Sequence, residues 1–166
     1  MGTAAALVYV TLGRRRIDYR FILAGAVAPD LVDASLAAFR IEGPTWRGPA
    51  HSLAALVVVT VVIVAALRGE TRLRVFGLAV GWLMHLVGDG MWTAPQTFFW
   101  PAFGSGFSML PGEPYSWDLV VHPLAHLTTW AGEVLGAAVL VWFWVAFRLG
   151  EDGRGARFAR DGYLRP

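Results

Sequence analysis

Residues 75–90 read VFGLAVGWLMHLVGDG, an apolar stretch that ends with a histidine and a carboxylate. On a helix, His85 and Asp89 are four residues apart and share one face, so both side chains can reach one ion or each other. Ionised groups are costly in hydrocarbon and usually face a bundle interior, a partner or a metal. The alternative is a capped helix end, where Gly88 and Gly90 stop the helix and Asp89 makes a polar turn.

Four further apolar stretches surround this one, at about 2–12, 21–39, 51–67 and 122–147. The chain has 166 residues, of which 56% are hydrophobic and 16% charged, whereas soluble domains carry about 25% charged residues. Spanning ~30 Å of hydrocarbon takes about 20 helical residues. We therefore predict an all-α integral membrane helix bundle with about five transmembrane or membrane-embedded helices. Residues 1–148 would form one membrane-embedded domain, and residues 149–166 a cytoplasmic arginine-rich tail.

The arginines orient the predicted bundle. All 14 basic residues are arginine, and most lie between the first and second stretches, between the third and fourth, or after the fifth. The long segment 91–121 has none. Because cytoplasmic loops carry the excess of positive charge, we predict a multi-pass protein of the bacterial inner membrane with a cytoplasmic C-terminus. The arginines flank apolar segments, so no nucleic-acid partner is expected, and the lipid bilayer is the predicted environment.

In this orientation the chain's histidines and several of its carboxylates gather at the outer membrane face. They are Asp30, Asp33, His51, His85, Asp89, His122 and His126. The topology was derived from the arginines alone, so the convergence is independent support for a shared site. No cysteine is present, which excludes thiolate metal sites and disulfides.

Each member of this set has a less specific interpretation. Asp30 and Asp33 share a helical face beside Pro29, which kinks a helix, but Asp30 can instead cap a helix that starts after the proline. A lone histidine such as His51, at a helix start, is more often an interfacial polar residue than a ligand. Arg47, four residues before it, is a candidate contact for an anionic group of a substrate.

The last histidine pair is equally ambiguous. His122 and His126 are four residues apart, so they either complete the site or form a polar stripe that faces other helices. The aromatic segment from 91 to 117 is interpreted as an interfacial loop, with a lid over the site as the alternative. The chain contains no G-x-S-x-G elbow, P-loop or dinucleotide fingerprint.

The order of these motifs is similar to that of a known family. APDLVD, RGPAHSL and GWLMHLVGDGMWTAPQTFFWPAFG resemble the membrane-bound metal-dependent hydrolases, the YdjM-like family, which is also described as LexA-binding and inner-membrane-associated. RRRIDYRFILAGAVAPDLVD resembles its small actinobacterial branch. The resemblance covers residues 14–104. It implies that Asp30 and Asp33 match the first acidic segment, His51 the central histidine, and His85 and Asp89 the last pair. The Asp-Leu-Val-Asp spacing and the lack of a histidine in residues 1–12 depart from the family pattern.

These observations predict a divalent-metal site with Asp33, His51, His85 and Asp89 as ligands and Asp30 as a ligand or the catalytic general base. Zinc suits the His/Asp set, and manganese or iron also fits. The expected function is metal-dependent hydrolysis of a lipid-linked ester or phosphoester. The alternatives are a haem-binding cytochrome b-like module and a non-catalytic membrane scaffold or ion conduit.

Overall fold

The computed structural model describes residues 18–38, 47–104, 106–107, 127–151 and 153–164. Every regular element in these ranges is a helix, as predicted from the sequence. The longer helices are α2 (Tyr19–Ala38), α3 (Leu53–Ala66), α4 (Gly69–Gly88), α7 (Leu127–Ala146) and α8 (Arg154–Asp161). The short ones are η1 (Pro49–His51), η2 (Met91–Thr93) and α5 (Pro95–Phe98).

Local chemistry explains where α3 and α4 begin and end. The Ser52 hydroxyl accepts a hydrogen bond from the Ala55 N–H at 3.1 Å and caps α3. Helix α4 starts in a polar sequence that contains the Glu70–Arg74 ion pair. This start lies several residues before the apolar stretch 75–90 from which the helix was predicted. It ends at Gly88, and Gly90 adopts φ +63°, a left-handed conformation that favours glycine.

Among the described helices, the closest packing joins α2 to α4. A Cβ atom on Gly25 would overlap the carbonyl oxygen of Leu78, and one on Gly81 would overlap that of Ile22. Only glycine allows the two backbones to come this close. Helix α2 also continues through Pro29 rather than ending there. The α2–α4 pair therefore has a fixed crossing just before the residues that form the site.

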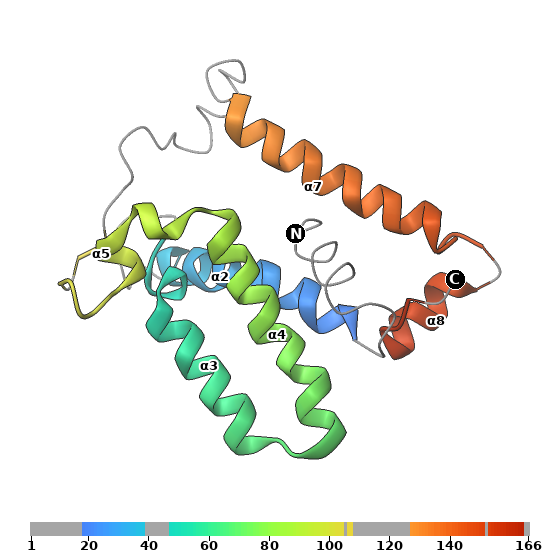
Figure 1. Cartoon of the computed structure of the whole chain (residues 1–166), viewed down its shortest axis with the longest axis horizontal. Coiled ribbons are helices and arrows are strands. Elements are labelled where there is room, and N and C mark those ends of the chain that lie inside the picture. The colour runs from blue at the N-terminus through green and yellow to red at the C-terminus, as the bar shows by residue number, and fades with distance from the viewer. Residues whose placement is uncertain (1–17, 39–46, 105, 108–126, 152, 165–166) are drawn as a thin grey trace.

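Two apolar clusters lie along this pair. One contains Ala50, Trp82, Leu86, Met91 and Ala94 and lies around the turn that carries His51. The other contains Tyr19, Ile22, Phe143 and Phe147, so it joins the start of α2 to the end of α7. Figure 1 shows α8 beside the start of α2, whereas α5 lies near the end of α4.

The predicted membrane spans are not confirmed. Within the described ranges, no helix combines the length and the apolar character that crossing a membrane requires. Helix α3 has 14 residues, where about 20 are needed, and α4 includes Glu70, Arg72 and Arg74. The predicted stretch at 2–12 lies outside the described residues.

Candidate metal centre

A short turn between α2 and α3 places His51 in the interior of the protein. Residues 49–51 form η1, and the His51 side chain is 0% exposed. The Trp82 Nε1–H on α4 donates to the Ala50 carbonyl at 2.9 Å, which holds the turn against α4. The buried Ser52 hydroxyl donates to the Pro49 carbonyl at 2.6 Å. The imidazole therefore projects from a turn that is fixed on both sides.

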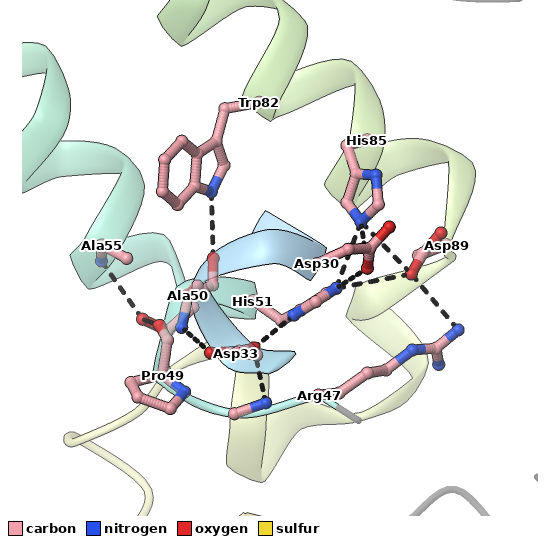
Figure 2. Close-up of polar contacts among 12 residues, drawn as sticks. Asp30, Asp33, Arg47, Pro49, Ala50, His51, Ala55, Trp82, His85 and Asp89 are labelled. Atoms are coloured by element: carbon pink, nitrogen blue, oxygen red, sulfur yellow. Dashed lines mark hydrogen bonds and ion pairs between the residues drawn. The ribbon is translucent and has the colours of Figure 1, made fainter. Parts of the chain in front are cut away.

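Asp33 on α2 holds this turn from the other direction (Figure 2). Its Oδ2 accepts hydrogen bonds from the Gly48 N–H at 2.7 Å and from His51 Nδ1 at 2.6 Å. Its Oδ1 accepts from the Ala50 N–H at 3.0 Å. A carboxylate can only accept, so His51 Nδ1 carries a proton, and in the neutral imidazole Nε2 then presents a lone pair. Asp33 thus fixes both the turn and the tautomer of His51.

His85 on α4 is oriented in the same way by a different acceptor. Its Nδ1–H donates to the Ala26 carbonyl oxygen of α2 at 2.9 Å. The two backbones meet at Gly25 of α2 and Gly81 of α4. Ala26 follows Gly25 directly, and His85 lies one helical turn after Gly81. The glycine crossing brings the carbonyl within reach of the ring and leaves Nε2 of His85 as the second lone pair.

The two Nε2 atoms and two carboxylates converge, as Figure 2 shows. The Nε2 atoms of His51 and His85 are 3.1 Å apart. Asp30 Oδ1 is 3.4 Å from each of them, and Asp89 Oδ2 is 3.7 Å from each. Ligand atoms of Asp30, His51 and His85 all lie within 4.8 Å of one another.

This donor set is suited to a cation. Two imidazole lone pairs at 3.1 Å repel each other unless a proton or a metal ion lies between them. Two nitrogens bound to one zinc ion at about 2.0–2.1 Å, with a bond angle of about 90–109°, are about 2.8–3.4 Å apart. The observed separation lies in that range. The two carboxylates add the negative charge that a divalent ion would neutralise, and the hydrogen-bonded Nδ1 atoms are typical of metal-ligating histidines.

The two outer carboxylates are the most exposed side chains of the site. The side chain of Asp30 is 59% exposed and that of Asp89 is 29% exposed, whereas His85 is 11% exposed. Arg47 lies at this rim, with its Nη2 3.4 Å from Asp89 Oδ2. A substrate would therefore approach past the two outer carboxylates and a guanidinium group.

The structure thus brings together Asp30, His51, His85 and Asp89, with Arg47 at the rim. Asp33 lies behind His51, where it accepts hydrogen bonds from three donors of the turn. His122 and His126 lie outside the described residues. The sequence did not predict the supporting groups, which are the Ala26 carbonyl, the Gly48 and Ala50 N–H groups, and Trp82. Trp82 precedes His85 by three residues, and this shared helical face is the one signal that could have identified it.

Comparison with known proteins identifies the family to which the chain belongs. The model of the YdjM inner membrane protein family matches residues 1–153, so the chain belongs to that family, as the motif order indicated. Family membership supports association with the inner membrane. Neither a curated protein nor a solved structure matches the chain.

Proposed function

We propose that this member of the YdjM inner membrane protein family is a membrane-bound, metal-dependent hydrolase. The observation that carries the proposal is the pair of imidazole Nε2 atoms 3.1 Å apart, each with its Nδ1 committed to an acceptor. His51, His85, Asp30 and Asp89 would hold the ion, which is zinc by the donor set, with manganese and iron as alternatives. Asp33, in the ligand set predicted from sequence, would instead orient His51.

The exposed Asp30 carboxylate lies where a substrate would meet the bound ion. A divalent ion bound there supplies Lewis acidity, which lowers the pKa of water and polarises a phosphoryl or acyl oxygen. Asp30, the most exposed of the four, is placed to accept a proton at the opening. Arg47 at the rim would bind an anionic group and hold the scissile bond near Asp30.

The outer surfaces of the helices favour a substrate delivered by the membrane. Large apolar side chains of α3 and α7 are exposed, among them Val57, Val58, Val61, Val62, Trp142, Trp144 and Val145. Contiguous exposed apolar surface indicates contact with lipid or protein. We infer a bilayer-embedded arrangement with a lipid-linked ester or phosphoester as substrate.

The distribution of charge supports an orientation in this membrane. Helix α4 carries Arg72 and Arg74 near its start and His85 at its end, and α2 carries Arg20 near its start and Asp30 in its second half. Because arginines favour the cytoplasmic side, the site would face the extracytoplasmic side.

Metal analysis of the purified protein combined with a hydrolysis panel tests the proposal. The panel contains phosphoesters, lipid esters and amides in detergent, with and without a chelator. We expect one equivalent of metal per chain, loss of turnover with chelator, and joint loss of metal and turnover in His85→Ala. Gln96→Ala, an exposed change on α5, is the control and should keep both.

Asp30→Asn separates catalysis from binding, since it should retain most of the metal and lose turnover if Asp30 accepts the proton. A protein without stoichiometric metal, or hydrolysis that is indifferent to the chelator and to His85→Ala, would refute the proposal and leave the scaffold or conduit alternative. A reduced-haem absorption band would instead establish the cytochrome alternative.

A further inference from the structure

We propose a second binding site, for one anionic phospholipid, at the end of the molecule formed by α8, the end of α7 and the start of α2. Tyr19 at this end and Asp33 near the His/Asp site are 14 positions apart on α2, which is about 21 Å along a helix. The proposed lipid site is therefore separate from the metal centre, and it does not depend on the hydrolase proposal. Two adjoining cavities carry the inference.

The first cavity has both polar and apolar lining residues and a volume of about 190 Å³. Arg154, Arg157 and Tyr163 line it together with the apolar Phe147, Leu149 and Phe158, and Asp161 contributes one carboxylate. Two guanidinium groups, which bind phosphate oxygens in a planar fork, outnumber the single acid. A phosphate diester with its glycerol is the group that suits this combination of charge and apolar wall.

The second cavity is almost wholly apolar and has a volume of about 410 Å³. It shares Leu149 and Phe158 with the first cavity, so the two cavities adjoin at this pair of side chains. Its other lining residues come from α2, α7 and the C-terminal region and include Leu23, Leu140, Phe143 and Leu164. Part of an acyl chain fits such a space, whereas a free phosphate or a nucleotide would leave it in contact with water.

Hydrogen bonds from Arg20 attach the end of α8 to the start of α2. The Arg20 guanidinium donates to the Ala159 and Arg160 carbonyls at the end of α8, at 2.9 and 2.7 Å. Asp18 accepts from the same guanidinium at 2.7 and 2.9 Å. A cation at a helix C-terminus is the favourable arrangement. Arg154 and Arg157 both belong to α8, which Figure 1 shows beside the start of α2.

Two further arginines, Arg74 and Arg148, form ion pairs outside the polar cavity. Arg74 binds Glu70 at 3.0 Å, and Arg148 binds Glu151 at 2.6 Å. Neither of them lines the polar cavity. Among the described residues, the two arginines that line the polar cavity both belong to α8, and this clustering favours one bound headgroup over diffuse attraction to a negative surface.

Lipid titration of the full-length protein in neutral detergent tests this inference. The probes are dioleoyl phosphatidylglycerol, dioleoyl phosphatidylcholine, glycerophosphoglycerol without acyl chains, and inorganic phosphate, and the readouts are bound lipid by native mass spectrometry and the shift in Tm. We expect one phosphatidylglycerol per chain and a higher Tm. Phosphatidylcholine, glycerophosphoglycerol and phosphate should bind much more weakly.

Three variants make the test specific. Arg154→Gln and the double variant with Arg157→Gln should weaken phosphatidylglycerol binding by roughly tenfold or more, since charge-assisted hydrogen bonds are lost. Ala159→Phe, which places a ring in the apolar cavity, should weaken binding without a change in charge. Arg72→Gln, an exposed arginine on α4, is the matched control and should bind as the native chain does.

Three results would overturn the inference. These are equal binding of the two lipids, an Arg72→Gln defect as large as that of Arg154→Gln, and phosphate binding as tight as that of the lipid, which would indicate a simple anion site. Circular dichroism without lipid verifies that each variant is folded, and Arg154→Gln alone decides the outcome if the double variant is not.

Discussion

Asp33→Asn is the substitution that best tests how the candidate metal centre is built. It keeps the size of the side chain but replaces one acceptor oxygen with an NH₂ donor. Asp33 accepts three hydrogen bonds, from the Gly48 and Ala50 N–H groups and from His51 Nδ1. If the amide oxygen replaces Oδ2, the NH₂ faces the Ala50 N–H. If it replaces Oδ1, the NH₂ faces both other donors. Either way at least one buried N–H loses its acceptor.

The magnitude follows from these contacts. An unsatisfied buried donor costs about 1–3 kcal/mol, and a hydrogen bond to a charged group contributes about 1.5–3 kcal/mol. We expect the free energy of unfolding of the metal-free protein to fall by about 2–4 kcal/mol. Metal affinity should fall by about 10–100-fold, the usual effect of removing a group that orients a ligating histidine. His51→Ala, which removes a proposed ligand outright, should reduce affinity more than this.

The assay is a chelator competition titration for zinc, combined with denaturant unfolding in the metal-free state. A ¹⁵N NMR spectrum of the imidazoles adds a readout that a purely structural role would leave unchanged, because in one amide orientation the NH₂ would donate to His51 Nδ1 and force the proton to Nε2. Ser35→Ala, an exposed change two residues along α2, is the control.

Two outcomes would refute this reasoning. Native metal affinity, native stability and an unchanged ¹⁵N spectrum in Asp33→Asn would mean that the carboxylate does not orient His51. A loss of affinity equal to that of His51→Ala, in a variant that is stably folded, would mean that Asp33 is itself a ligand, as the sequence alone suggested.

Three further experiments test the orientation of the chain in the membrane and the packing around the site. A reporter active only in the cytoplasm and fused to Pro166 should give signal if the arginines set the orientation; a silent fusion beside an active periplasmic one contradicts it. Gly81→Ala should destabilise the protein by about 1–3 kcal/mol or more and weaken metal binding with it, because the same backbone contact brings the Ala26 carbonyl to His85; unchanged zinc affinity in a chelator titration would separate the two. Trp82→Phe leaves the buried Ala50 carbonyl without its donor and should lower the free energy of unfolding by about 1–3 kcal/mol, measured by denaturant titration; an unchanged midpoint would show that the turn does not need this bond.

Some features of the protein follow from the sequence because they depend on a few adjacent residues. The helical class, the shared face of His85 and Asp89 and the helix start beside Ser52 are of this kind. Each is fixed by the helical period or by one capping side chain. The apolar stretch 75–90 predicts a start for α4 that is too late, because the helix begins at Gly69. Apolar content indicates burial, whereas the Glu70–Arg74 ion pair stabilises helix in a polar stretch.

Only the tertiary structure determines that the two aspartates of α2 have different roles. Asp30 and Asp33 are three residues apart and alike by local criteria, yet one faces the two Nε2 atoms and the other the back of His51. What separates them is the position of the turn at 48–51, whose backbone N–H groups occupy Asp33. The distance between His51 and His85 likewise depends on how closely α2 and α4 approach at Gly25 and Gly81. Helical periodicity specifies directions within one helix, whereas the contact between two helices depends on backbone atoms that are distant in the chain.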